Sequence, residues 1–227
     1  MRSVWRTEVA EDVREAAAIG VAMAVVGASF GAVAEAKGVS LLLIMAMSLL
    51  VFAGSAQFLA VGVMAAGGAP IAAVLGGLLV NARHLPYGLA VGDAVGRSWP
   101  RRLLGTHLMV DQAVATATSR TDPKRARRAY WLVGGTLFVL WNVGTLLGAV
   151  AGGAVPDPDR LGVDAAFPAA LLAMILPALR AAGDARRVAL LGSVLALLAT
   201  PWLPPGLPVL IALFGLAVAG RPARAGA

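Results

Sequence analysis

The sequence has no cysteine and few charged side chains for its length. With no cysteine among 227 residues, disulfide bonds, thiolate chemistry and cysteine-ligated metals are excluded. Only 14% of the residues are charged, against about 25% in ordinary soluble domains, while 59% are hydrophobic. Residues 38–82 contain no Asp, Glu, Lys, Arg or His. These absences exclude a soluble enzyme, a DNA-binding domain and a secreted disulfide scaffold.

The uncharged run 38–82 predicts a polytopic membrane protein. A single helix over this run would reach roughly 68 Å, about twice the thickness of a hydrocarbon core of about 30 Å. The chain must therefore cross the membrane and return. The uncharged blocks are residues 16–34, 38–82, 129–156, 165–179 and 188–220. We predict an all-α integral membrane protein with seven to eight spans, located in the inner (cytoplasmic) membrane.

The same charge pattern divides the chain. Residues 1–15 are predicted to form a cytoplasmic N-terminal segment, residues 16–220 a single transmembrane domain, and residues 221–227 a C-terminal tail. The apolar run 16–34 is too long for a typical signal-peptide core and ends without an A-x-A cleavage site. We therefore interpret it as a first transmembrane helix, and we predict that both termini are cytoplasmic.

The net charge of +7 indicates membrane topology rather than nucleic-acid binding. Arginine supplies 17 of the 19 cationic residues, which cluster between apolar blocks without interleaved aromatic residues. Positive residues gather in cytoplasmic loops of membrane proteins. The predicted partners are therefore the lipid bilayer and a small molecule, and no nucleic acid.

Two segments allow alternative paths. The arginine-rich loops 97–102 and 120–128 flank residues 103–119. If residues 103–119 cross once, one basic loop lies outside; both stay inside if the segment enters and leaves on one side, or lies along the interface. Residues 39–66 form either one long tilted helix or two short arms broken near Gly54. The sequence leaves both choices open.

A weak internal repeat is present. Residues 26–34 read VGASFGAVA and residues 143–151 read VGTLLGAVA, with six identities in nine positions. Each contains Gly-x-x-x-Gly, which lets two helix backbones approach closely in lipid. Membrane helices rich in glycine and alanine also match one another by chance. A true repeat, with halves 16–119 and 128–220, would indicate the two-repeat, broken-helix architecture of secondary transporters.

Polar side chains inside the apolar blocks are the candidate functional residues, because a polar group in lipid needs a partner or water. The substrate-binding candidates are Gly54, Ser55, Gln57, Asn81, Arg83 and Asn142; the proton-coupling candidates are Asp111, His84 and His107. His107 and Asp111 share one helix face, and Arg83 is a candidate partner for that carboxylate. The simpler alternatives are interhelical hydrogen bonds for Gln57 and Asn142, and a snorkelling helix-end position for Arg83.

The sequence gives little support to an enzyme. It contains no Walker-type loop, EF-hand, H-E-x-x-H motif or Rossmann fingerprint, so we predict no cofactor, no metal and no enzymatic activity. Residues 27–31, GASFG, fit G-x-S-x-G, but a nucleophile elbow needs a strand before it and a helix after it. A remote alternative is an intramembrane hydrolase with Ser29 or Ser55 as the nucleophile and one of the two histidines as the base.

Several motifs in combination resemble the AzlC family of branched-chain amino acid exporters. They are FAGSAQF at 52–58, NARH at 81–84, the pair Asp111-Gln112, WNVGTLLGAVAG at 141–152 and LGVDAAFPAALLAMILP at 161–177. The resemblance covers most of the chain, from about residue 16 to residue 177. The family more often reads FAGA, NLRH and T-D-E. Ser55 and Ala82 therefore depart from its pattern, and Gln112 stands where the family has a second acidic residue.

The resemblance implies a permease subunit that exports branched-chain or similar small amino acids together with a small AzlD-type membrane subunit. Members are often labelled ABC permeases, but this chain has no nucleotide-binding motif, so proton-coupled secondary transport is our preferred interpretation. The alternative is a channel or a structural subunit of such a multi-component permease.

The residue roles follow as a hypothesis. Arg83 or a helix end near Gly54 would hold the substrate carboxylate. Three amide side chains would add hydrogen bonds, those of Gln57, Asn81 and Asn142. Asp111, with His84 or His107, would handle the amine or the proton.

Overall fold

A computed structural model describes residues 2–154, 172, 176, 179–180, 183–203, 207–212 and 214–215. These residues form helices and turns and contain no strand, which confirms the all-α class. The helices are α1 (Arg2–Ala36), α2 (Leu41–Ala46), the π-helix η1 (Met47–Val51), α3 (Gly54–Ala65), α4 (Pro70–Asn81), α5 (His84–Val95), α6 (Trp99–His107), α7 (Asp111–Thr118), α8 (Pro123–Gly153), α10 (Gly183–Ala199) and α11 (Leu207–Ile211). Within the described residues, two helices are long and apolar enough to span a membrane, Thr7–Ala36 and Pro123–Gly153. The count of seven to eight spans stays a prediction.

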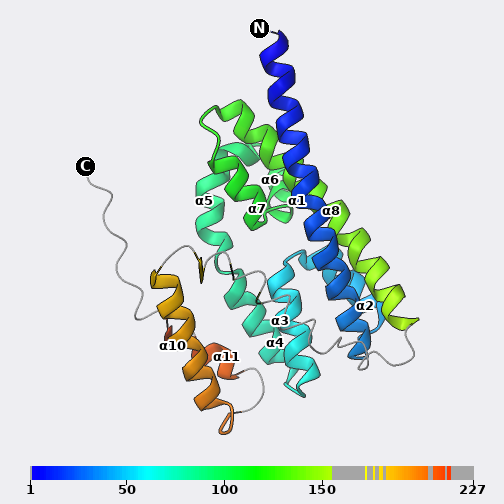
Figure 1. The fold of residues 1–227 in the computed structure, drawn as a ribbon, viewed down its shortest axis with the longest axis vertical. Coiled ribbons are helices and arrows are strands. Elements are labelled where there is room, and N and C mark those ends of the chain that lie inside the picture. The colour runs from blue at the N-terminus through cyan, green and yellow to red at the C-terminus, as the bar shows by residue number, and fades with distance from the viewer. Residues whose placement is uncertain are drawn as a thin grey trace.

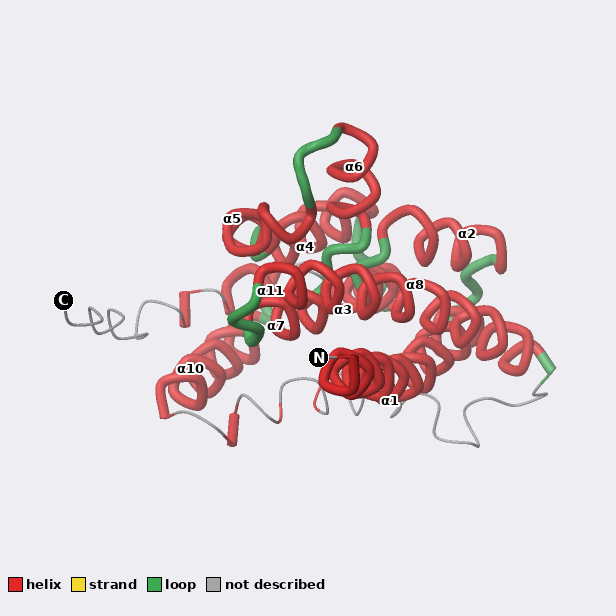
Figure 2. The backbone as a smooth tube through the Cα atoms, turned by 90° about the horizontal axis from the view of Figure 1, so that it is seen from above, coloured by secondary structure: helices red, strands yellow, loops and turns green. Residues whose placement is uncertain are grey.

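Helices α1 and α8 lie side by side and form the frame of the fold (Figures 1 and 2). They run in the same direction, because Asp12 bonds to Arg128 near both N-terminal ends, whereas Gly31 packs against Ala149 near both C-terminal ends. The two stretches of the sequence repeat lie on these helices. The structure therefore sets them parallel, not inverted.

Glycine residues allow the close approach of α1 and α8. A Cβ atom on Gly148 would overlap the backbone of Ala28 on α1. A Cβ atom on Gly31 would likewise overlap the backbone of Thr145 on α8. The helix-packing role predicted for the Gly-x-x-x-Gly stretches is confirmed, since only hydrogen fits between these backbones.

Residues 39–66 form two short arms that are separated by a break before Gly54, and not one long tilted helix. The Ser40 hydroxyl accepts a hydrogen bond from the backbone N–H of Leu43 (3.4 Å) and caps the start of α2. The helix widens into η1 and ends at Phe52, whose φ of 44° is left-handed. The Phe52 ring packs edge-on against Phe138 (5.0 Å between centroids), and this contact helps to hold a backbone conformation that is unfavourable for a bulky residue. The chain then turns back as α3, starting at Gly54.

A second break separates α4 from α5. Pro86 has no N–H to donate to the carbonyl of residue 82, so a continuous helix is interrupted there. The N–H of Leu85 instead donates to the carbonyl of Ala82 (3.1 Å), which is a tighter turn than an α-helix makes. Arg83 lies within this interruption. In Figure 1, α3 and α4 occupy the lower half of the molecule and α5, α6 and α7 the upper half.

Residues 103–119 also form a broken segment. Helix α6 ends at His107, the backbone is extended at Val110, and α7 begins at Asp111. The two helices have only 9 and 8 residues, so each covers roughly 12–14 Å. Neither is long enough to cross a hydrocarbon core of about 30 Å.

The two basic loops lie at the same end of the molecule. Arg101, in the first turn of α6, and Arg127, near the start of α8, line one surface hollow. Arg120, which follows α7, pairs with Asp12 near the N-terminal end of α1. The chain thus returns through the α6–α7 hairpin to the end of the molecule from which it came, and this path is compatible with the arrangement in which residues 103–119 do not cross the membrane.

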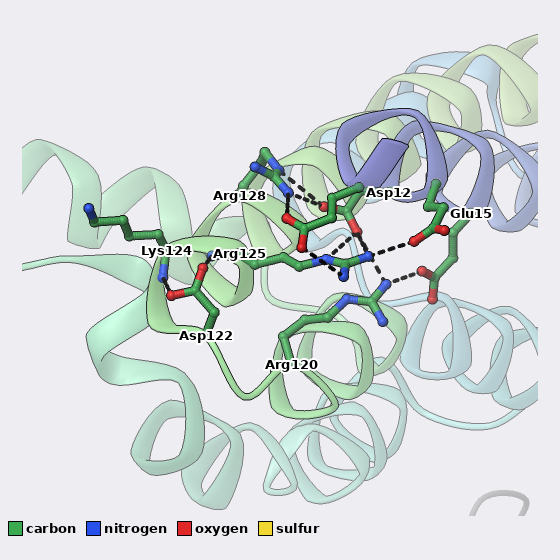
Figure 3. Close-up of polar contacts among 9 residues, drawn as sticks. Asp12, Glu15, Arg120, Asp122, Lys124, Arg125 and Arg128 are labelled. Atoms are coloured by element: carbon green, nitrogen blue, oxygen red, sulfur yellow. Dashed lines mark hydrogen bonds and ion pairs between the residues drawn. The ribbon is translucent and has the colours of Figure 1, made fainter. Parts of the chain in front are cut away.

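A charged cluster ties α1 to the start of α8 (Figure 3). Asp12 is only 2% exposed and accepts hydrogen bonds from Arg125 (3.2 Å) and Arg128 (2.7 Å). Arg120 pairs with Glu15 and with Asp12. Several guanidinium donors thus compensate one buried carboxylate, as a buried charge requires. The charged N-terminal segment predicted from the sequence continues directly into α1.

The last apolar block, residues 188–220, is interrupted near its prolines. Helix α10 ends at Ala199, just before Pro201, and α11 begins at Leu207. Most of residues 161–177, one of the stretches that carry the family resemblance, lies outside the described residues.

Candidate functional site

Three helix breaks meet at one small cavity near the middle of the α1–α8 frame. Helices α3, α5 and α7 begin at Gly54, His84 and Asp111, and all three of these residues line the cavity. The other lining residues are Met23, Val26, Phe52, Ala53, Ser55, Arg83, Val110, Gln112, Leu137 and Trp141. Breaking the helices brings together side chains that are far apart in the sequence.

An ion pair occupies the polar side of this cavity. Arg83 Nη1 donates to Asp111 Oδ2 (2.7 Å), and Arg83 Nη2 donates to Ser55 Oγ (2.7 Å). The predicted partnership of Arg83 with Asp111 is therefore confirmed. The two charged side chains remain 32% and 37% exposed, so the pair is accessible from the cavity. A guanidinium with two short hydrogen bonds is a well-oriented site for carboxylate groups.

His84 connects two of the breaks. Its Nδ1 lies 3.0 Å from the carbonyl oxygen of Asn81, and its Nε2 lies 3.1 Å from the carbonyl oxygen of Met109. A carbonyl oxygen only accepts hydrogen bonds, and a neutral imidazole can donate from only one nitrogen. In either neutral tautomer the ring therefore donates to one of these two carbonyl oxygens, so His84 contacts both the end of α4 and the segment before α7.

The converging helix starts make the cavity favourable for an anion. The first turn of a helix has backbone N–H groups without helical partners, and it carries partial positive charge. Here the starts of α3 and α7 contribute together with Arg83, whereas in the first turn of α5 the Leu85 N–H already donates to Ala82 and Pro86 has no N–H. Asp111 lies in the first turn of α7, which stabilises its carboxylate.

Several polar atoms around the cavity lack partners. Asp111 Oδ1, Arg83 Nε and Trp141 Nε1 are shielded from solvent and make no hydrogen bond in the described part of the chain. Such atoms require explanation, because an unsatisfied buried polar group is costly. The cavity itself measures about 50 Å³, far less than the roughly 300 Å³ at which typical small-molecule pockets begin. In this conformation the helix ends therefore enclose the ion pair closely.

Apolar residues form the opposite wall. Trp141 stacks with Phe30 (6.2 Å between centroids) and approaches the start of α3. A Cβ atom on Gly54 would lie 2.7 Å from the Trp141 ring, so glycine is required for this approach. The cavity thus has a charged side and an apolar side, as a ligand with a charged head and an apolar side chain needs.

Comparison with known proteins identifies the family. A family model described as AzlC protein matches residues 18–155, which is more than half of the chain. The chain belongs to the AzlC family. The matched range includes every lining residue of the cavity.

Curated relatives of this AzlC-family chain are distant. The branched-chain amino acid transport protein AzlC of Bacillus subtilis is 27% identical over 128 residues, which cover 56% of this chain and 50% of the relative. An uncharacterized membrane protein of Haemophilus influenzae is 26% identical over 133 residues, covering 57% of this chain and 54% of the relative. The chain therefore spans about half the length of the curated relatives that it matches. No solved structure matches the chain.

Four of the predicted site residues of this AzlC-family chain lie outside the ion-pair cavity. Gln57, which is 1% exposed, and Asn81 line a second, apolar cavity of about 350 Å³ between α3, α4 and the α2–η1 segment. The Asn142 amide donates to the carbonyl of Phe138 in its own helix (2.8 Å). His107 packs against the ring of Phe138 (5.5 Å between centroids). The structure thus groups Gly54, Ser55, Arg83, His84 and Asp111, and separates them from the other four.

Eight lining residues of the cavity were not among the predicted site residues, and three of them make distinctive contributions. Phe52 has the left-handed backbone, Trp141 forms the apolar wall, and Gln112 donates to the sulfur of Met23 (3.4 Å). Trp141 and Gln112 each adjoin a residue that was selected, Asn142 and Asp111. For Trp141 the missing signal was helix phase: neighbours on a helix point about 100° apart, and only the packing decides that Trp141 and not Asn142 faces the cavity.

Proposed function

We propose that this chain is the transport subunit of a membrane carrier that exports branched-chain or similar small amino acids in exchange for protons. The observation that carries the proposal is the Arg83–Asp111 ion pair, held at three converging helix starts beside an apolar wall. Family membership and the printed name of the Bacillus subtilis relative support the solute class.

The charge pattern of the ion pair matches an amino acid zwitterion. The substrate carboxylate would take the Nη donors of Arg83 together with the Ser55 hydroxyl. The substrate ammonium group would take the Asp111 carboxylate, whose Oδ1 now lacks a partner. A branched side chain would then contact Val26, Leu137 and Trp141. The bound zwitterion would separate Arg83 from Asp111. Its carboxylate would replace Asp111 as the partner of Arg83, and its ammonium group would replace Arg83 as the partner of Asp111.

Competition at Asp111 would couple transport to protons. A protonated Asp111 cannot form an ion pair with the substrate ammonium group, so the proton and the substrate exclude each other. Such exclusion is the requirement for exchange, in which an inward proton flow drives an outward substrate flow. His84, which lies between two carbonyl oxygens, would be the second residue to take part in proton transfer.

The broken helices would supply the movement. The present cavity is too small for valine or leucine, so the helix ends must separate before a substrate can enter. The interruptions at Phe52–Ala53, Ala82–Arg83 and Leu108–Val110 lack continuous helical hydrogen bonding and can act as hinges. We place the carrier in the inner membrane as a multi-pass protein that works with a small AzlD-type subunit, as the family resemblance implies.

The decisive experiment measures efflux of labelled valine and leucine from vesicles containing this chain and the small subunit. Asp111→Asn keeps the size of the side chain and removes its charge. We expect a proton gradient to accelerate wild-type efflux. The gradient-driven efflux of the variant should be lower by a factor of about 10 or more, since a hydrogen bond to a charged group contributes about 1.5–3 kcal/mol. Asp93→Asn is the matched control, because Asp93 lies at the far end of α5, away from the cavity.

Efflux that rises linearly with concentration, without saturation or dependence on the proton gradient, would indicate a channel. If efflux by Asp111→Asn depended on the proton gradient as strongly as wild-type efflux does, the exchange mechanism proposed for Asp111 would be wrong.

A further inference from the structure

The surface around α6 carries unpaired positive charge and exposed apolar side chains. Trp99, Leu103 and Leu104 are 71%, 54% and 55% exposed. Arg101 and Arg102 are exposed beside them, and within the described residues their guanidinium groups make no hydrogen bond or ion pair. Figure 2 shows α6 at the outer edge of the helix assembly, far from α1. A helix that mixes arginine with exposed tryptophan and leucine is typical of a membrane–water interface.

This helix is held rigidly on its inner side. The Tyr130 hydroxyl donates to the carbonyl of Gly105 (2.8 Å), and a Cβ atom on Gly105 would lie 2.6 Å from Val95 and 3.3 Å from Trp131. The exposed residues of α6 therefore have a defined position relative to α8.

A hollow of about 540 Å³ lies between α6 and α8. It is lined by Pro100, Arg101, Leu104, Arg127 and Trp131. Arg127 uses Nη2 to donate to the backbone carbonyl of Asp93 (2.9 Å), and its other guanidinium nitrogens make no hydrogen bond within the described residues. No carboxylate lines the hollow among these residues, so its two charged groups are both cations.

We propose that this hollow binds the phosphodiester headgroup of an anionic phospholipid on the cytoplasmic side of the membrane. Arg101 and Arg127 offer planar, multi-donor groups suited to phosphate oxygens. Trp131 and Leu104 form an apolar floor, and Trp99 and Leu103 lie beside the path of the acyl chains. Both basic loops lie at this end, where the positive-inside rule places the cytoplasm. The occupant is a lipid and not a free anion, because the arginines are surrounded by exposed apolar surface.

The test measures lipid retention by the purified full chain. Native mass spectrometry in detergent would compare phosphatidylglycerol with phosphatidylcholine of identical acyl chains. We expect a clear preference for phosphatidylglycerol, and a loss of about fivefold for each arginine removed, hence roughly 25-fold in the double variant Arg101→Gln/Arg127→Gln. Arg97→Gln is the matched control; it removes the same charge from a residue that lines a different cavity. Its effect should stay below about twofold.

Three results would overturn the proposal. These are equal retention of the two lipids by the wild type, an equal loss in Arg97→Gln, and displacement of phosphatidylglycerol by millimolar inorganic phosphate, which would make the hollow a site for soluble anions. If removal of Arg127 impairs folding, the single variant Arg101→Gln tests the proposal. Arg101→Lys should retain most of the preference for phosphatidylglycerol because it retains the charge. The lipid site is independent of the transported solute.

Discussion

Arg83 illustrates how a charged residue persists within an apolar assembly. Its guanidinium bonds to one carboxylate and one hydroxyl, from residues 28 positions away in either direction along the chain. Neither partner is on its own helix. A snorkelling arginine would instead extend to the surface and leave Asp111 unpaired. The contacts of Arg83 therefore differ from those of a snorkelling helix-end arginine, and its role in substrate binding stays a proposal.

At the residue scale, we expect the shape of the Arg83 side chain to matter as well as its charge. Lysine has a single ammonium group and cannot reproduce the planar fork that reaches Ser55 and Asp111 together. Arg83→Lys should raise the KM for valine efflux by about 10-fold or more, as expected for loss of a charge-assisted contact of about 1.5–3 kcal/mol. Ser55→Ala, which removes one neutral partner, should raise it by only about 2–10-fold. Wild-type KM values in Arg83→Lys would contradict a bidentate role.

At the scale of elements, glycine positions decide which helices touch. Helix α8 has glycines on more than one face, and their surroundings differ. Gly148 meets the backbone of α1, whereas a Cβ on Gly135 would have no atom within 4 Å in the described structure. The same residue type therefore has a packing role at one position and none at the other.

This difference gives a matched pair of substitutions. Gly148→Ala should lower the midpoint of thermal unfolding, because forcing a methyl group between two backbones costs about 1–3 kcal/mol or more. Gly135→Ala should leave the midpoint unchanged or raise it, since alanine favours a helix by about 1 kcal/mol over glycine. Both midpoints can be followed by fluorescence-detected size-exclusion chromatography after heating. Equal midpoints would show that the α1–α8 contact is looser than the structure indicates.

At the scale of the whole molecule, two long helices run through both halves and the broken segments fill the space beside them (Figure 1). Helix α3 turns back from the cavity into one half, and the α6–α7 hairpin approaches it from the other half. This arrangement places both basic loops at one end, together with the charged cluster around Asp12.

The absence of native cysteine allows this topology to be tested directly. Ser98→Cys and Thr121→Cys, in the two basic loops, should both react with a membrane-impermeant maleimide from the cytoplasmic side only. Ala69→Cys, in the exposed turn between α3 and α4, should react from the opposite side only. Labelling of intact cells and inverted vesicles measures each site. Reaction of residues 98 and 121 from opposite sides would mean that 103–119 crosses the membrane.

Much of the candidate site was predictable because polar residues are rare in this chain. Ser55, Arg83, His84 and Asp111 stand out from apolar surroundings, and the partnership of Arg83 with Asp111 follows from charge alone. Gln57 and Asn142 stand out equally, yet they lie elsewhere. The sequence shows that a residue is polar but not where its side chain lies. Asn142 donates within its own helix, and Gln57 lies beside the second cavity without a hydrogen-bond partner in the described residues.

The sequence by itself indicated that this is a membrane protein, since the length of the uncharged runs and the position of the arginines depend only on the order of residues. It offered a break near Gly54 as one of two choices and gave no prediction of the break before Pro86, and the structure shows both. Only the tertiary structure decided that 103–119 turns back, that Trp141 and not Asn142 faces the cavity, and that three helix starts converge on one ion pair. Those outcomes depend on packing between segments distant in the chain, where the direction of each side chain is set by its neighbours in space.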